Sequence, residues 1–266
     1  MSGMLGRLGH LLIAIAEPHR ETLAEYNRWF EAEHMYDAVL VGPGAFAANR
    51  YVATRDLKQS RYPRDGGMFA DPSLGSYVAL YYLAPDTAEA HFAWSFPQNQ
   101  WLGETGRNNA NRTLVQTWLC DHLESISRTD HEVPPHVALD HPYEAMAMVY
   151  VDPPADVDVS DARRALREHL ASRLDGSPLA QAQLWSPRDF PDTQGVPTTP
   201  GTVAPNRNAG RQTLVVLFLD EAIADGWPIL ATLGDDLRAA GAGDTRLVTV
   251  WRPVVRGTDL YADELW

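Results

Sequence analysis

The predicted order strand-helix-strand-strand-helix-strand occurs twice along the 266 residues, and this repeat constrains the fold more than any other feature. Three pairs of markers recur at offsets of 135, 133 and 137 residues: Glu33-His34 with Glu168-His169, Trp118 with Trp251, and Val78–Tyr82 with Val215–Leu219. One such unit forms a four-stranded antiparallel sheet with two helices on one face, so the other face needs cover. Two units packed sheet against sheet supply that cover, which predicts a duplicated α+β protein.

The first half starts with a buried strand at Leu11–Ala16, followed by a helix. The helix carries an apolar stripe, Leu23, Tyr26, Phe30 and His34, that advances by three or four residues. The other elements of this half are expected as strands at 45–54, 77–83 and 113–123, a helix at 85–97 with a further helical piece around residue 101, and a polar loop at 55–76.

The second half repeats this order after a linker rich in proline and histidine. Strands are expected at 144–151, 180–185, 213–219 and 245–253, with a long loop at 186–210. One helix is expected to have Ser160 as its N-cap, and another to span about 229–239. We therefore expect two tandem ferredoxin-like βαββαβ units, at 1–127 and 143–256, with a linker at 128–142, a tail at 257–266, and antiparallel sheets packed into one α+β barrel.

Charge and composition narrow the classes of partner. The net charge of −13 makes nucleic acid a poor partner. The apolar run Leu11–Ala16 is too short to cross a membrane or to form a signal-peptide core, so a cytoplasmic protein without a membrane partner is expected. The single cysteine, Cys120, excludes an internal disulfide. Walker, dinucleotide-binding, serine-hydrolase and zincin motifs are missing from the sequence.

A short motif in the first half suggests a family. Tyr26-x-x-Trp29-x-x-x-x-His34 is followed by Gly42-Pro43-Gly44 and then by Asn49-Arg50-Tyr51. This pattern resembles the EthD-like branch of the dimeric α+β barrel superfamily over roughly residues 10–125, and only faintly over 143–255. The resemblance implies that one chain forms the barrel that other members build from two chains, with a homodimer left open. It also implies a choice among cofactor-free monooxygenases, cyclases, decarboxylases and isomerases.

Four residues are candidates for catalysis. His34 lies at the end of the apolar stripe, where an imidazole would be partly desolvated and would exchange a proton near neutral pH. Asp37 follows one turn later and could orient it. Tyr26 could donate its phenol to a carbonyl or enolate, and Arg50 could stabilise an oxyanion or hold a carboxylate. Each could instead have a purely structural role.

Aromatic side chains are the candidates for binding a ring. Residues 77–101 are unusually aromatic, which is typical either of core packing or of a pocket for a flat molecule. The candidate substrate-binding residues are Trp29, Tyr51, Tyr81, His91, Trp94 and Trp101. The partner expected from them is a small hydrophobic or aromatic molecule.

Two further clusters favour structure over chemistry. In the linker, His131, His136 and His141 recur every five residues, but the segment contains two adjacent prolines and is expected to be a surface strap, so no metal is predicted. Cys120 and His122 lie on either side of Asp121, and a buried structural thiol is favoured over a Cys-His dyad.

The function expected from these residues is a cofactor-independent enzyme that uses acid/base proton transfer on a small ring-bearing carbonyl compound, such as a cyclase, dehydratase, isomerase or decarboxylase. The alternatives are a cofactor-free monooxygenase and a non-catalytic binding module for a hydrophobic metabolite. The motif is intact only in the first half, so the pocket is expected there, near His34. The loops at 55–76 and 186–210 are expected to act as lids, with Gly66-Gly67 as the hinge of the first.

Overall fold

Eight antiparallel strands form a closed barrel in a computed structural model that describes residues 7–65, 67–191 and 209–266. Around the barrel the order is β1-β3-β2-β8-β5-β7-β6-β4. The strands are β1 (His10–Pro18), β2 (Ala45–Val52), β3 (Tyr77–Leu83), β4 (Arg112–Ser127), β5 (Ala145–Asp152), β6 (Leu179–Arg188), β7 (Thr213–Leu219) and β8 (Asp244–Pro253). The predicted α+β fold class is confirmed.

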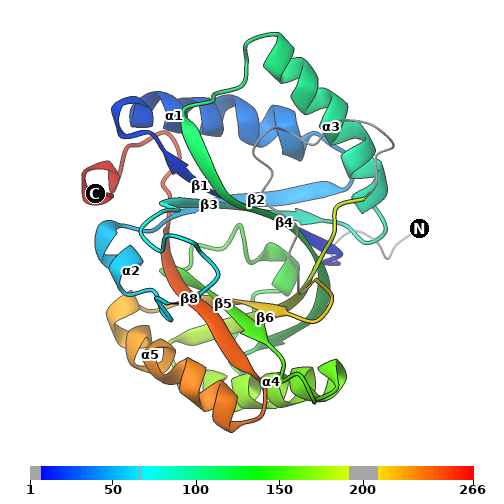
Figure 1. Ribbon diagram of the computed structural model, residues 1–266, viewed down its shortest axis with the longest axis vertical. Helices are drawn as coiled ribbons and strands as arrows, with labels where there is room; N and C mark the ends of the chain where they lie inside the picture. The colour runs from blue at the N-terminus through cyan, green and yellow to red at the C-terminus, as the bar shows by residue number, and fades with distance from the viewer. Residues whose placement is uncertain (1–6, 66, 192–208) are drawn as a thin grey trace.

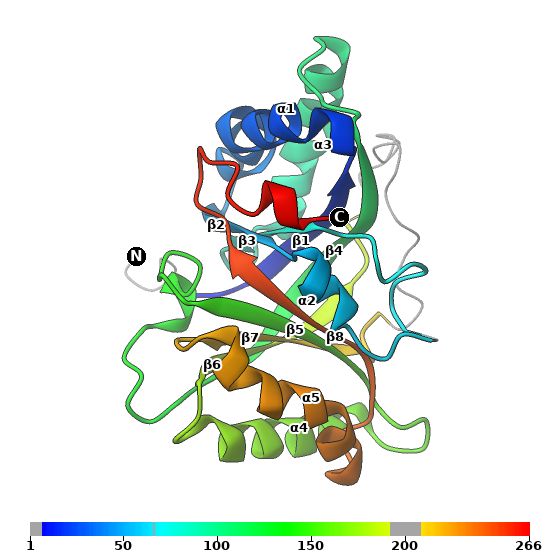
Figure 2. The same ribbon diagram turned by 90° about the vertical axis from the view of Figure 1, so that its left-hand side faces the viewer.

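Helices cover the barrel on two opposite sides. Figure 1 shows α1 and α3 above the sheet of the first half and α4 and α5 below that of the second. The α-helices are α1 (Leu23–Trp29), α2 (Arg55–Gln59), α3 (Ala88–Glu104), α4 (Val159–Leu174) and α5 (Ile223–Ala239). Short 3-10 segments lie at Arg20–Thr22, Pro135–Val137 and Ala262–Glu264. The turned view in Figure 2 shows the same layering, helices outside and two sheets between them.

Each half has the same strand order. In the first half β1 lies between β3 and β4, and β2 lies outside β3; in the second half β5 lies between β7 and β8, and β6 lies outside β7. The halves join along β4 and β6 over eight residue pairs, and more briefly where Tyr51 and Val52 meet Pro253 and Arg252. Because helices cover one face of each sheet and the opposite sheet covers the other, the central strands are buried along nearly their whole length.

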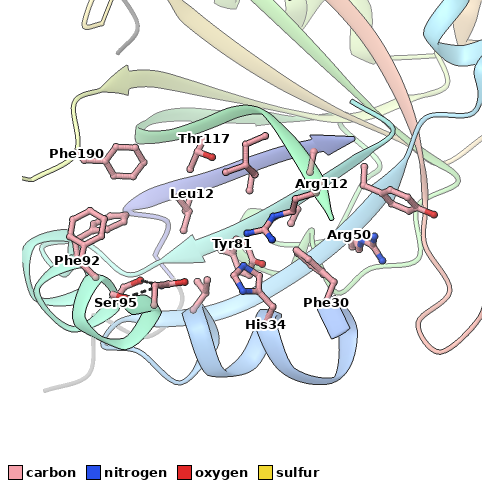
Figure 3. A pocket seen from close by; sticks show the side chains of 18 of the residues that line it. Leu12, Phe30, His34, Arg50, Tyr81, Phe92, Ser95, Arg112, Thr117 and Phe190 are labelled. Carbon is pink, nitrogen blue, oxygen red and sulfur yellow. Dashed lines mark hydrogen bonds between the residues drawn. The ribbon is translucent and has the colours of Figure 1, made fainter. Parts of the chain in front are cut away.

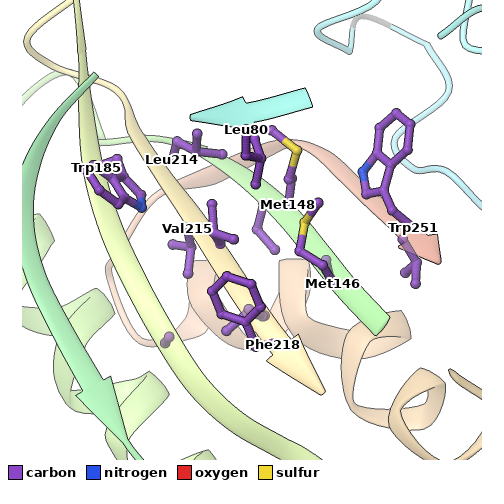
Figure 4. Close-up of a cluster of buried hydrophobic side chains, with 14 of the residues drawn as sticks. Leu80, Met146, Met148, Trp185, Leu214, Val215, Phe218 and Trp251 are labelled. Carbon is purple, nitrogen blue, oxygen red and sulfur yellow. The ribbon is translucent and has the colours of Figure 1, made fainter. Parts of the chain in front are cut away.

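The barrel interior is a packed core. Figure 4 shows large side chains from both halves meeting there, among them Leu80, Met146, Met148, Trp185, Phe218 and Trp251. The phenol of Tyr82 donates to Gln183 at 2.7 Å, and that of Tyr150 donates to Gln116 at 3.1 Å. These bonds satisfy polar groups that would be costly to bury alone.

Several local expectations need correction. The helix that begins as α1 continues as two π-helical segments, η2 (Phe30–His34) and η3 (Tyr36–Leu40), rather than as α-helix. The N-cap of α4 is Asp158, whose carboxylate accepts from the Ser160 backbone N–H at 2.8 Å. Helix α3 runs through Pro97, where a break was expected.

The described part of the segment between β2 and β3 packs against the barrel, and its residues Arg55, Lys58 and Leu74 line a pocket beside Glu17 and Trp266. It contains α2, and the buried guanidinium of Arg61 donates to the backbone carbonyls of Pro72, Leu74 and Gly75 at 2.5 to 2.9 Å. Phe69 packs into the barrel core. The described residues of 55–76 are not among those that line the cavity beside His34, and a lid role for this segment stays a prediction. Its hinge residue Gly66, and most of the second expected lid, lie outside the described residues.

Among the helices of the described residues, none is both long and apolar enough to cross a bilayer.

Candidate functional site

A cavity of about 120 Å³ lies in the first half, between the outer face of its sheet and the layer formed by α1, η2, η3 and α3. Figure 3 shows side chains from the strands and from the helices pointing into it. The apolar wall includes Leu12, Ala14, Ala16, Phe30, Val39, Ala79, Phe92, Phe96, Leu114 and Phe190; the polar groups are Tyr26, His34, Arg50, Tyr77, Tyr81, Ser95, Asn99, Arg112 and Thr117.

Strand alternation decides which of the predicted residues reach the cavity. Arg50 and Tyr81 point toward it, whereas their neighbours Tyr51 and Tyr82 lie on the opposite face, in the barrel core. Tyr51, expected to contact substrate, is therefore remote from the cavity.

Arg112 reaches the cavity through an irregularity in β4. The register between β1 and β4 shifts between Ile15 and Ala16, so one extra residue stands in β4 at that point. As a result Arg112 and Leu114 share the cavity face with Thr117, although strict alternation would put them on opposite faces.

His34 lies at the end of the π-helical segment η2, and its imidazole points into the cavity. Its ring stacks on Trp29 at 4.5 Å between centroids and lies 5.4 Å from Phe30. Burial, and secondarily the charge of Arg112, lowers the pKa of His34 to about 3. The sequence-based expectation of proton exchange near neutral pH is wrong for the free protein, because this imidazole is neutral at pH 7.

The guanidinium of Arg112 stands beside His34 and Tyr81 (Figure 3). It lies over the ring of Trp29, 4.8 Å from the centroid, and it also makes a long contact of 3.5 Å with the amide oxygen of Asn108. Burial lowers the pKa of Arg112, and the phenols of Tyr26 and Tyr81 oppose that effect. Arg112 therefore brings a positive charge to the wall of a largely apolar cavity.

Arg50, in contrast, already has its charge compensated. It forms an ion pair with Glu31 at 2.9 Å and donates to the side-chain oxygen of Asn27 at 2.8 Å. Its guanidinium also stacks 3.9 Å from the ring centroid of Tyr77. Both charged partners are almost fully buried, so this pair holds α1 and η2 against β2.

Tyr26 and Tyr81 place neutral phenols in the cavity. Both side chains are buried, and burial raises the pKa of each hydroxyl. At neutral pH both are hydrogen-bond donors.

The other predicted site residues lie elsewhere. Asp37 forms an ion pair with Arg107, which also contacts Glu33 at 3.2 Å, and no hydrogen bond joins Asp37 to His34 in the part of the chain that the structure describes. The role of Asp37 in orienting His34 is not seen. Trp29 backs His34, and its indole N–H donates to the Arg107 carbonyl at 2.7 Å.

Three of the predicted aromatic contacts are structural or exposed. His91 is fully buried, with its Nδ1 atom 3.0 Å from the Pro43 carbonyl, and a side chain at Gly42 would collide with Trp94 and His91. These two rings therefore support the Gly42-Pro43-Gly44 turn. Trp101 is 47% exposed on α3.

Sequence reasoning missed several cavity residues. Phe92 and Phe96 were noted only as members of an aromatic run, and Ser95 and Asn99 follow them on the same helix α3. Phe190 comes from the second half of the chain and packs edge-on against Phe92 at 5.0 Å. Residues 92, 95, 96 and 99 are spaced three or four apart, and this spacing places them on one face of a helix, so it could have identified all four as neighbours in the cavity wall.

The remaining titratable clusters stay structural. Cys120 is buried in the barrel core, and burial raises the pKa of its thiol. His131 lies 2.6 Å from the Tyr143 hydroxyl. Within the described ranges, no group of three or more His, Cys, Asp or Glu side chains is placed to hold a metal ion.

No protein-family model and no curated protein sequence matches the chain. Solved structures do. A candidate chlorite dismutase shares 12% identity with a TM-score of 0.51, covering 96% of this chain and 97% of its own. A mutant chlorite dismutase from Candidatus Nitrospira defluvii, in complex with cyanide, shares 8% identity with a TM-score of 0.50. The match covers 96% of this chain and 94% of that one. A heme-binding protein from Thermus thermophilus shares 9% identity with a TM-score of 0.45. The match covers 94% of this chain and 92% of that one.

This chain has the dimeric α+β barrel fold. At such identities the likeness shows the fold alone, and the EthD-like branch in particular is not shown. Two of the structures that share the fold are named for chlorite dismutase. The main functional expectation, a cofactor-independent lyase or isomerase acting on a carbonyl compound, is therefore corrected, because these two structures are named for chlorite dismutase, which is neither.

The cavity does not fit a heme. Its volume of about 120 Å³ is close to the ~150 Å³ of a cavity that binds one benzene molecule, whereas heme is a macrocycle of four pyrrole rings. In the second half, leucines of α4 and α5 fill the layer between helices and sheet, and the pocket beside Ala162 and Leu166 has a volume of about 0 Å³. The cavity size instead matches a single aromatic ring.

Proposed function

We propose that the chain is an oxygenase-type enzyme that binds a small single-ring phenol in the cavity of the first half and oxidises it without a resident heme. The observation that carries this proposal is the convergence of an arginine, a neutral imidazole and two phenols on a one-ring cavity. The resemblance to a superfamily that includes cofactor-free monooxygenases agrees with it.

The chemistry begins with ionisation of the substrate hydroxyl. A phenolate gives electrons to molecular oxygen more readily than the neutral phenol does, so a site that stabilises the anion promotes the reaction. Arg112 would stabilise the negative oxygen, and Tyr26 or Tyr81 would donate a hydrogen bond to it. His34 would accept the proton, because a phenolate beside it favours the charged imidazolium and so opposes the burial and the Arg112 charge that lower its pKa.

The reaction balances without an external reductant. A phenol and one O₂ give a quinone and one water: one oxygen atom enters the ring as a carbonyl, and the other leaves with two hydrogens. The ring supplies all the electrons that reduce O₂. The stoichiometry to expect is one O₂ consumed for each phenol oxidised.

Oxygen uptake tests the proposal. The full chain, treated with chelator and supplied with no heme, is incubated with a panel of mono- and dihydroxybenzenes in an oxygen electrode. We expect substrate-dependent uptake that falls by about 10²- to 10⁴-fold in His34→Gln, the usual contribution of one general base. The melting temperature of the variant controls for a loss of folding.

A second candidate is a non-catalytic binding module, favoured by one observation. A histidine with a pKa of about 3 is a weak base in the free protein. General bases work best near the operating pH, so the assay covers about pH 6 to 9. Binding of phenols without oxygen uptake anywhere in this range would support the binding module and exclude the oxygenase.

A further inference from the structure

Arg112 has no acidic partner in the cavity wall. Of the two arginines that line the cavity, Arg50 is paired with Glu31. Around Arg112, in the residues that the structure describes, no carboxylate lies within ion-pair distance, and the side-chain groups that influence its charge are the phenols of Tyr26 and Tyr81. Its guanidinium N–H donors are left with only the long contact to Asn108.

A half-buried cation without a counter-ion is unfavourable unless an anion completes the site. The neighbours of Arg112 suit an anion, because Tyr26 and Tyr81 can donate hydrogen bonds and His34 is neutral. Much of the rest of the wall is apolar, with Phe92 and Phe96 on α3, and Ser95, Asn99 and Thr117 add uncharged polar groups.

We infer that the cavity takes one aromatic ring bearing a singly charged anionic oxygen, a carboxylate or a phenolate, with that oxygen bound to Arg112. The inference rests on the proposed function in that it assigns the ligand class of the same cavity. Arg112 is then the residue that selects ionised over neutral ligands.

Charge and size narrow this class. A phosphate ester would bring up to two negative charges to a wall whose other arginine, Arg50, is already paired with Glu31, so the desolvation cost of the second charge would not be offset. A cavity of about 120 Å³ leaves room for one ring and a short substituent. Arg50 does not compete for the anion, because Glu31 already neutralises it.

The test compares benzoate with benzamide, which have the same size but differ in charge. Calorimetric titration of the full chain, without oxygen, is expected to show benzoate binding about 10- to 100-fold more tightly, the contribution of a hydrogen bond to a charged group. In Arg112→Met this preference should disappear. In Arg28→Met, which removes an exposed arginine of α1 that contacts Asp259 and not the cavity, the preference should persist.

A second probe separates the two anion types. Para-nitrophenol is coloured only as the phenolate, so binding to wild type below its own pKa should deepen the colour, and binding to Arg112→Met should not. If the protein prefers benzoate to benzamide but does not deepen the colour of para-nitrophenol, the site binds carboxylates. If it does both, the site binds carboxylates and phenolates alike.

Three results would overturn the inference: equal affinity for benzoate and benzamide, a preference that survives in folded Arg112→Met, or no binding of either probe. Arg112→Met should be no less stable than wild type, because the substitution breaks no ion pair in the described residues. Since none of these measurements depends on turnover, tight benzoate binding without oxygen uptake would refute the oxygenase alone.

Discussion

Replacing His34 with glutamine should make the free energy of unfolding fall less steeply as the pH is lowered below about 6.5. In the unfolded chain this histidine has a pKa near 6.5, and in the folded protein burial and Arg112 lower its pKa to about 3. Between these pH values the unfolded state binds a proton that the folded state does not. The free energy of unfolding therefore falls as pH drops below about 6.5, and this contribution is fully lost only near pH 3.

The size of the effect follows from the shift. Going from pH 7.5 to 4.5 should cost wild type about 2.5 kcal/mol through this one residue, at about 1.4 kcal/mol for each pH unit below the unfolded pKa. The titratable groups that face His34 are Arg112 and the phenols of Tyr26 and Tyr81, and none of these changes charge in that range.

Urea unfolding of wild type and His34→Gln across this pH range measures the difference directly. Because other groups titrate equally in both proteins, the stability difference should change by about 2.5 kcal/mol in favour of the variant as pH falls. Saturating benzoate should reduce the change, because a bound anion raises the pKa of His34. Parallel curves for the two proteins would refute the assignment of His34 as a half-buried neutral imidazole.

Three other substitutions probe the cavity wall. Glu31→Gln leaves the buried Arg50 without its counter-ion and should lower the free energy of unfolding by about 3 kcal/mol, seen in urea; a loss below about 1 kcal/mol would mean that the pair is solvated. Asp37→Asn removes only the half-exposed pair with Arg107 and should change stability by less than about 1 kcal/mol and benzoate affinity not at all; a large fall in affinity would restore Asp37 to the site. Phe190→Ala should raise the dissociation rate of bound ligand in stopped flow, because this ring covers Phe92 at the cavity wall; unchanged dissociation would place Phe190 outside the entry route.

The sequence was sufficient for the fold because its signals were local. Alternating or continuous apolar runs bounded by Gly and Pro located the strands, and β3 and β7 were predicted with their observed limits. The repeat then implied the barrel, since a lone βαββαβ sheet leaves one face bare. The π-helical turns of η2 and η3 could not be predicted, because they depend on packing and not on a period in the sequence.

The sequence could predict a site residue only where a local pattern along the chain was enough to place it. His34 and Tyr26, proposed from a helical stripe, and Tyr81, proposed from an aromatic run, all line the cavity. Arg112 was missed because the irregularity in β4 reverses the parity of its first residues, and such a register shift has no signature in the sequence of one strand.

Long-range contacts were the other limit. Phe190 reaches the cavity from the opposite half of the chain, and the compensation of Arg50 by Glu31 depends on how a helix packs on a strand. Neither contact follows from spacing along the chain. Tyr51 was misassigned for a simpler reason: its neighbour Arg50 faces the cavity, so alternation turns Tyr51 into the barrel core.

A crystal structure of the protein grown with para-nitrophenol would test the account most directly. We predict density for one ring in the first-half cavity, beside Tyr81 and Phe92, with the phenolate oxygen within hydrogen-bond distance of Arg112 and near His34. A ring bound only in the surface groove between Arg28 and Asp259, with the cavity closed by its own side chains, would contradict it.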